Sequence, residues 1–367
     1  MVAEQTVAPE AEIKIAQLKV VGVGGGGSNA VSRMYRERLE DVEYITVNTD
    51  AQALVRSDVP SKIRIGDAIA AGLGVGGDPD KGLACAEESK DELRDVLAGA
   101  DMVFIAAGMG GGTGTGAAPI IAEVAQELGA LTVGIVTRPF SFEGARRKRV
   151  ADEGISRLRD KVDSFIIIPN DRLLIATDAD MTMESGFRMA DNVLRRSVQS
   201  IAELITVPGE INVDFADVRA IMTNAGPTWM SIGYGSGENR AIEAAEEAIN
   251  SSLLEVSISG ARGVIFNITS GGDATIAEVQ TASEVIQRVV DPEANIIFGM
   301  THDPKMENEI KLTVVATGFT SAEETIQAQE EMADQLGSMT SDDLDVPPFL
   351  RHHPQARRAL RNPVASS

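Results

Sequence analysis

The sequence has little of several things that common protein classes require. It contains one cysteine in 367 residues, Cys85, which excludes an internal disulfide and suits a reducing compartment. No apolar run approaches the length of a membrane span. No G-x-x-x-x-G-K-[ST] segment occurs, which excludes a P-loop site. Positive charge is scarce too: 33 Lys and Arg residues against 55 acidic residues give a formal charge of −22, so no nucleic-acid partner is expected.

The length of the chain and the order of its patterns predict two domains with tails. Residues 1–17 are acidic, lack a stretch of signal-peptide type and are expected to form a flexible tail. Short apolar runs then alternate with helical patterns, which favours an α/β fold, a Rossmann-like parallel sheet covered by helices. The expected strands are 18–23, 44–48, 101–107, 131–137 and 164–168, and the expected helices are 29–39 and one that starts near Pro119.

A longer helix is expected at about 184–207, because apolar residues recur there at steps of four, three and four (Leu194, Val198, Ile201, Ile205). A second α/β region follows, with expected strands at 218–223, 264–269, 295–300 and 311–317 and expected helices at 240–249 and 276–290. The predicted organisation is therefore a nucleotide-binding domain at 18–183, a central helix at 184–208, a second domain at 209–319, a linker at 320–343 and a terminal segment at 344–367.

Glycine is abundant, with 35 residues that cluster at 22–27, 72–77 and 108–116. The first cluster matches G-x-G-x-x-G between an expected strand and a helix, where backbone N–H groups can hold phosphate. Asp50 follows the second strand, roughly where dinucleotide enzymes carry a ribose-binding acid. On these residues alone, an NAD-dependent oxidoreductase is a fair alternative.

The segment at 106–116, AAGMGGGTGTG, favours a different nucleotide site. It also joins a strand to a helix, and two glycine loops at the carboxyl ends of strands in one sheet can hold one polyphosphate. Thr113 and Thr115 add hydroxyls for phosphate or Mg²⁺. An oxidoreductase has no need of this second loop.

Residues 110–116, GGGTGTG, resemble the signature of the tubulin/FtsZ family of GTPases, and the flanking FIAAGMG at 104–110 resembles its FtsZ form. The resemblance runs from about residue 18 to 318 and resumes at 344–351. It implies a tubulin-like two-domain fold and a polymerising protein that binds GTP or GDP with Mg²⁺ and hydrolyses GTP. It further implies head-to-tail filaments that form the division ring at midcell, on the cytoplasmic face of the membrane.

The resemblance also implies roles for individual residues. Glu143 and Arg147 match a pair that contacts the sugar, and Asn170, Phe187 and Asp191 would face the base. By themselves these residues leave guanine and adenine open, and Glu143 with Arg147 is an ordinary helical ion pair. The full nucleotide-binding set would be Gly25, Gly26, Gly27, Ser28, Asn29, Asn48, Gly111, Gly112, Thr113, Gly114, Thr115, Glu143, Arg147, Asn170, Phe187 and Asp191.

An acidic segment, INVDFAD at 211–217, follows the long helix. By chemistry alone, Asp214 and Asp217 fit a helix N-cap with an acid in the first turn. The resemblance implies instead a loop that reaches the nucleotide of the next subunit, with both carboxylates catalytic and Asn212 positioning them. Carboxylates mounted on another chain would couple hydrolysis to assembly. A catalytically silent polymer of the same fold is an alternative, against which this segment argues.

Residues 344–351, LDVPPFLR, form an apolar island in a polar tail, which is typical of a docking peptide. The resemblance implies that this segment binds membrane-anchoring and regulatory division proteins, so the protein itself would not insert into the membrane. A related archaeal tubulin-like protein concerned with cell shape is a near alternative, and the tail peptide favours division.

Overall fold

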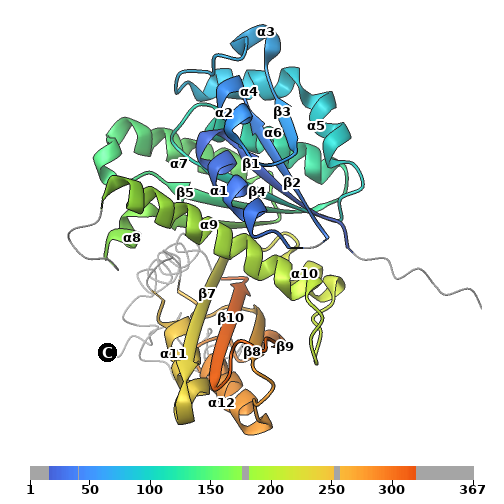
Figure 1. Ribbon diagram of the computed structural model, residues 1–367, viewed down its shortest axis with the longest axis vertical. Helices are drawn as coiled ribbons and strands as arrows, with labels where there is room; N and C mark the ends of the chain where they lie inside the picture. The colour runs from blue at the N-terminus through green and yellow to red at the C-terminus, as the bar shows by residue number, and fades with distance from the viewer. Residues whose placement is uncertain (1–15, 40, 176–181, 252–256, 320–367) are drawn as a thin grey trace, which may run out of the picture. The chain divides into compact units, whose positions relative to one another are not determined.

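The computed structural model describes residues 16–39, 41–175, 182–251 and 257–319. A ten-stranded sheet runs through these residues in the order β3-β2-β1-β4-β5-β6-β7-β10-β8-β9 (Figure 1). The strands are β1 (Leu18–Val23), β2 (Val42–Asn48), β3 (Ser61–Arg64), β4 (Met102–Gly108), β5 (Leu131–Arg138), β6 (Ser164–Pro169), β7 (Gly226–Ser236), β8 (Gly263–Ser270), β9 (Asn295–His302) and β10 (Glu309–Thr317). The α-helices are α1 (Gly24–Arg36), α2 (Ala51–Arg56), α3 (Asp67–Ala70), α4 (Pro79–Glu88), α5 (Lys90–Leu97), α6 (Thr113–Glu127), α7 (Ala145–Arg159), α8 (Asn170–Ile175), α9 (Met183–Thr206), α10 (Phe215–Met222), α11 (Arg240–Ile249) and α12 (Ile276–Gln287).

The first six strands of the sheet order are parallel to one another, as the alternating pattern predicts. Neighbouring residues of a strand enter different cores: Val20 packs with α1 and α9, whereas Val21 packs with α4 to α7. The sheet is therefore covered by helices on both faces, which explains why its strands are continuous apolar runs. In the second half, β7, β10 and β8 pair antiparallel, and β9 joins β8 in parallel.

Two helices begin earlier than the sequence suggests. α1 starts at Gly24 instead of residue 29, and α6 starts at Thr113, so that Pro119 lies inside the helix instead of in its first turn. The glycines that looked like loop residues allow close packing of helices. A Cβ on Gly116, for example, would lie 2.0 Å from the carbonyl oxygen of Pro79 in α4.

The predicted strand at 218–223 is wrong, because these residues belong to α10 and its end. The Asp214 carboxylate accepts a hydrogen bond from the backbone N–H of Asp217 at 2.7 Å and caps the helix. This N-cap outweighs the β-branched residues that suggested a strand. The first strand of the second half is instead β7, which was not predicted from the sequence.

The central helix α9 was predicted well and has 24 residues. Its buried face carries Leu194, Val198 and Ile201, which pack against the sheet and α1. Figure 1 shows α9 with α8 before its start and α10 after its end. In the described part of the chain, no helix is both long and apolar enough to cross a membrane.

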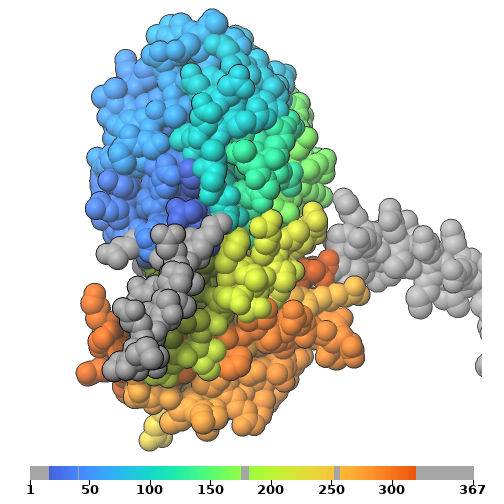
Figure 2. Space-filling view, turned by 90° about the vertical axis from the view of Figure 1, so that its right-hand side faces the viewer, coloured from blue at the N-terminus to red at the C-terminus, as the bar shows by residue number. Residues whose placement is uncertain are grey.

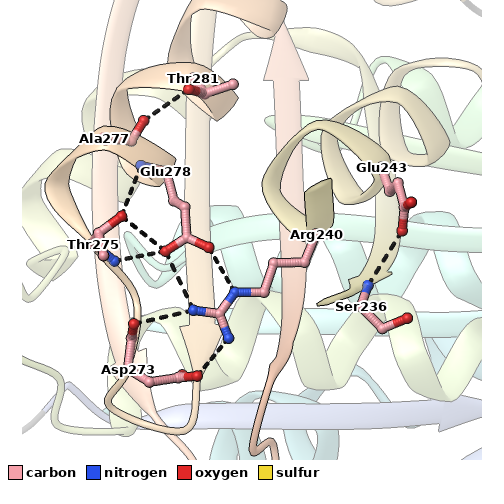
Figure 3. Close-up of polar contacts among 8 residues, drawn as sticks. All are labelled: Ser236, Arg240, Glu243, Asp273, Thr275, Ala277, Glu278 and Thr281. Atoms are coloured by element: carbon pink, nitrogen blue, oxygen red, sulfur yellow. Dashed lines mark hydrogen bonds and ion pairs between the residues drawn. The ribbon is translucent and has the colours of Figure 1, made fainter. Parts of the chain in front are cut away.

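A buried cation holds α11 to the start of α12 (Figure 3). The side chain of Arg240 is only 5% exposed and lies 2.6 Å from Asp273 and 2.7 Å from Glu278. Glu278 also accepts from the backbone N–H of Thr275, which completes a capping box for α12. The hydrogen bonds from Arg240 lower the pKa of Glu278 to about 2. The cluster therefore acts as a structural clamp between two helices.

Candidate nucleotide site

A cavity of about 380 Å³ lies where β1, β4, β5 and β6 end. Parallel strands have their carboxyl ends at one edge of the sheet, and in open α/β sheets ligands bind at that edge. The wall residues are Gly25, Gly26, Asn29, Gly108, Met109, Gly111, Gly112, Thr113, Gly114, Thr137, Pro139, Glu143, Arg147, Asn170, Phe187, Ala190, Asp191 and Leu194. The structure thus brings together most of the predicted nucleotide residues.

The two glycine loops touch each other at the cavity. Gly24 has φ +70°, and a Cβ there would lie 2.7 Å from the backbone N of Gly114. A Cβ on Gly114 would in turn lie 2.8 Å from the carbonyl oxygen of Gly108. Only glycine permits these approaches. The result is a wall of backbone, next to the N-termini of α1 and α6, that can present N–H groups to an anion.

The two threonine hydroxyls of the second loop are already engaged within the protein. Thr113 Oγ1 lies 2.7 Å from Thr49 Oγ1, and the backbone N–H of Gly110 donates to Thr115 Oγ1 at 2.9 Å. Thr113 lines the cavity, whereas Thr115 is 2% exposed behind it. In this structure both hydroxyls brace the loop.

Gly82, on α4, packs against the second glycine loop, and the sequence analysis did not predict this role. Its Cβ would lie 2.5 Å from the carbonyl oxygen of Gly112 and 3.2 Å from Cα of Thr113. A glycine inside a helix costs about 1 kcal/mol relative to alanine, so its presence is a weak signal of a packing constraint.

Glu143 and Arg147 form the ion pair expected from their spacing. The Glu143 side chain is 9% exposed, and its second carboxylate oxygen accepts from the backbone N–H of Phe140 at 2.9 Å. The carboxylate is therefore fixed in orientation, while Arg147 is half-exposed at the cavity wall.

The far end of the cavity holds acceptors that need donors. Asn170 is 5% exposed, and among the described residues its Oδ1 has no hydrogen-bond partner. Burial raises the pKa of Asp191 to about 6, although Arg33 at 3.4 Å lowers it. The ring of Phe187 is 41% exposed and meets Phe140 edge-on at 5.5 Å. A flat ligand that carries N–H donors on one edge fits this end.

Four predicted residues, Gly27, Ser28, Asn48 and Thr115, do not line the cavity. Asn48 is buried and accepts from the backbone N–H of Asp50. The Asp50 carboxylate accepts from the N–H groups of Gln52 and Ala53 and caps α2, so it is committed to the fold rather than to a ribose. Six wall residues were not in the predicted nucleotide-binding set: Gly108, Met109, Thr137, Pro139, Ala190 and Leu194. Gly108 and Met109 had been placed in the second glycine loop, and Leu194 on the apolar face of the long helix.

The acidic segment lies away from this cavity. Leu194 is the last residue of α9 at the cavity wall, and the helix continues to Thr206. Those twelve residues span about 18 Å at about 1.5 Å each. Asp214 is exposed beyond that end, and the segment that carries α10 (yellow-green) lies at the surface (Figure 2). Asn212 accepts from the backbone N–H of Gly209 at 2.6 Å, which fixes the turn before it.

Among the residues that the structure describes, no group of three His, Cys, Asp or Glu side chains could hold a metal ion. The predicted linker at 320–343 and the predicted docking peptide at 344–351 lie outside the described residues, as does most of the predicted N-terminal tail.

Comparison with known proteins agrees with this geometry. The model of the Tubulin/FtsZ family GTPase domain matches residues 17–178, and that of the FtsZ family C-terminal domain matches residues 226–320. FtsZ from M. jannaschii, solved as an empty dimer, is 42% identical; the match covers 84% of this chain and 89% of that one, with a TM-score of 0.79. A GDP-bound CetZ monomer from Haloferax volcanii shares the fold at 20% identity, covering 87% of this chain and 99% of that one, with a TM-score of 0.73.

Proposed function

This chain belongs to the tubulin/FtsZ family and is a GTPase, and on that premise we propose that it assembles head to tail into filaments of the division ring. Neighbours solved as an FtsZ dimer and as a CetZ protofilament support self-assembly. We assign the nucleotide domain to residues 18–183, the central helix to 184–208 and the second domain to 209–319. The ring would lie at midcell, on the cytoplasmic face of the membrane.

The cavity suits a guanine nucleotide. Asp191 and the Oδ1 of Asn170, which has no hydrogen-bond partner in the described part of the chain, would accept from the donors on N1 and N2 of the base, with Phe187 beside its face. Glu143 and Arg147 would contact the sugar. The glycine loops would hold the phosphates through backbone N–H groups, with Gly27, Ser28, Asn48 and Thr115 supporting the wall. Because no cluster of carboxylates or histidines for a metal occurs in the described part of the chain, phosphate oxygens and water would provide most ligands of Mg²⁺.

The observation that carries the proposed mechanism is the separation between Asp214, Asp217 and the cavity. Since α9 continues about 18 Å beyond the cavity wall before the chain reaches these carboxylates, the arrangement favours action on the nucleotide of another chain. They would act on the nucleotide of the next subunit, where they orient and polarise the attacking water. Asn212 would position the segment. Such a contact is heterologous and does not close, so it produces filaments.

Two inactive variants test the shared site. Asp217→Ala should bind GTP and assemble but hydrolyse hardly any of it. Gly25→Glu should bind no GTP, because its carboxylate enters the cavity and repels phosphate, although its Cβ meets no atom within 4 Å. Mixing the two variants should restore hydrolysis, since each supplies the half that the other lacks. Gly25→Ala is the matched control and should remain active.

Phosphate release from each variant alone and from the mixture is the measurement. If the mixture stays as inactive as its components although both variants are folded and join filaments, the carboxylates do not act between subunits. If Asp217→Ala alone turns over GTP normally, Asp217 is not catalytic.

The segment at 344–351 would bind membrane-anchoring and regulatory division proteins. Attachment to the membrane would then depend on these partners, and no nucleic acid would be involved, in keeping with the formal charge of −22.

A further inference from the structure

A second cavity, of about 540 Å³, lies beside the nucleotide cavity and shares Asn29 with it. Five arginines from α1, α2 and α9 line it: Arg33, Arg36, Arg56, Arg188 and Arg195. Of the wall residues that the structure describes, Glu37 is the one that is acidic. We call this cavity the arginine pocket.

The concentration of positive charge is unusual for this chain. The formal charge is −22, so a small anion is repelled by the molecule as a whole and is drawn only to a local cluster of cations. Guanidinium groups also have five donors in a fixed plane, a geometry that matches the oxygens of phosphate groups. Among the described residues of the wall there is no lysine, so each cation among them has this geometry.

The arginines are only partly neutralised by their neighbours. Arg36 pairs with Asp58, and their side chains are 69% and 46% exposed. Arg188 pairs with Glu184, and that pair is more than half exposed as well. Exposed ion pairs contribute about 0–1 kcal/mol, so an incoming anion can replace their carboxylates at small cost.

Two other arginines have donors to spare. Among the described residues, Arg56 forms no ion pair, and it is exposed at the wall. In the described part of the chain, Arg33 forms one ion pair, with Asp191 at 3.4 Å, which leaves most of its donors unused there. Arg195 is 18% exposed and held by Glu37 at 2.8 Å, so it forms a fixed part of the pocket.

We propose that the arginine pocket binds a small anion that carries two or more phosphoryl groups, at a site separate from the nucleotide cavity. The volume lies within the range of small-molecule sites, about 300–1,000 Å³, whereas an acidic segment of protein would need a longer groove. Two phosphoryl groups could engage Arg36 and Arg56 near the opening and Arg33 and Arg195 further in.

The test is calorimetric titration of inorganic pyrophosphate into the full-length protein at low salt and without Mg²⁺. Saturation with GDP beforehand blocks the glycine loops, so that pyrophosphate can reach only other sites. The expected result is one saturable site per chain. The double variant Arg36→Gln/Arg56→Gln should bind pyrophosphate about tenfold more weakly or worse, because two guanidinium contacts are lost.

The control variant Arg149→Gln/Arg288→Gln removes the same charge from exposed positions outside the pocket. It should bind pyrophosphate as the unmodified protein does. GDP affinity is measured on every variant, so a failure of the nucleotide site is recognised separately.

Three results would overturn the proposal. The first is the lack of saturable binding to the GDP-loaded protein. The second is equal weakening in both double variants, which means diffuse attraction to an adventitious ion only. The third is binding that occurs only after Glu323, Glu324, Glu330 and Glu331 are all changed to Gln, which would mean that the acidic segment of the chain itself is the ligand.

Discussion

At the scale of single residues, chemistry that depends on a pattern was readable from the sequence, and chemistry that depends on packing was not. Residues 111–114 of the GGGTGTG segment and the pair Glu143 and Arg147 were predicted and lie at the cavity. Gly82 and Thr49 were given no such role, because their effect on the second loop passes through contacts between distant segments. The local sequence of α4 does not indicate that Gly82 must lie against the backbone of the second glycine loop.

Asp191 should make nucleotide binding depend on pH. Burial raises its pKa to about 6, and in the proposed role its carboxyl must be ionised to accept from the N–H groups of guanine. GDP affinity should therefore be constant above pH 7 and fall as the pH drops through 6. Because the phosphates of GDP titrate in the same range, the informative quantity is the difference between the unmodified protein and Asp191→Asn. The variant should bind GDP more weakly at pH 7.5 and lose this part of the pH dependence.

The same pKa has a consequence for the free energy of unfolding. The pKa of the Asp191 carboxyl in the folded protein lies above its unfolded value of 3.8. The free energy of unfolding of the protein therefore decreases as the pH rises from about 4 to 6. At neutral pH the empty Asp191→Asn protein should therefore be more stable by about 1–3 kcal/mol. Asp91→Asn, at a fully exposed position, serves as the control and should change neither the GDP affinity nor the free energy of unfolding. A less stable Asp191→Asn protein would contradict the assignment.

Gly82→Ala tests whether α4 positions the phosphate-binding loop. The added Cβ would lie 2.5 Å from the carbonyl oxygen of Gly112, so either the loop or the helix must shift. We expect GTP to bind about tenfold more weakly or worse, corresponding to about 1.4 kcal/mol or more, although alanine favours the helix. Fluorescence titration with a labelled nucleotide is the measurement.

Lys81→Ala, an exposed change on the same helix, should bind nucleotide normally. If Gly82→Ala binds as tightly as Lys81→Ala, the contact with Gly112 does not hold the loop in its binding conformation.

At the scale of helices and strands, the sequence predicted which elements exist better than it predicted where each element begins and ends. Buried parallel strands were found, since each is a continuous apolar run. Residues 218–223 were predicted as a strand, although the chemistry of Asp214 and Asp217 had indicated a helix N-cap with an acid in its first turn. The structure confirms that cap, and the helix it starts continues through Val218 and Ile221. The start of α6 was placed too late, since a glycine-rich segment was not recognised as a helix in close contact with α4.

Arg240 should be essential to the clamp between α11 and α12. Arg240→Met leaves Asp273 and Glu278 close together without their cation, and should lower the free energy of unfolding by about 3 kcal/mol. In the unmodified protein, the contribution of Glu278 is present above about pH 4.5 and is lost as the pH falls toward 2. The variant should lack this loss. Arg288→Met, at an exposed position, should change little.

Denaturant unfolding of the three proteins at pH 7 and at low pH is the measurement. Equal stabilities of Arg240→Met and Arg288→Met would mean that the buried cluster contributes nothing to the joining of these helices.

At the scale of the whole molecule, α9 lies between the two parts of the proposed active site. Its first half, with Asp191 and Leu194, forms part of the cavity wall, and its other end leads to Asp214 and Asp217. A single chain therefore carries both halves of the proposed site at opposite ends of one helix. The sequence contained both halves as motifs. Their separation by the length of a helix became visible only in the fold.

The most direct test of this account is the rate of GTP hydrolysis per molecule against protein concentration, with light scattering on the same samples and ATP as the control nucleotide. The account predicts a rate per molecule near zero at low concentration, which rises together with scattering as filaments form. A rate per molecule that stays constant over the whole range without scattering would show that one chain completes its own site, and would contradict the proposed role of Asp214 and Asp217 between subunits.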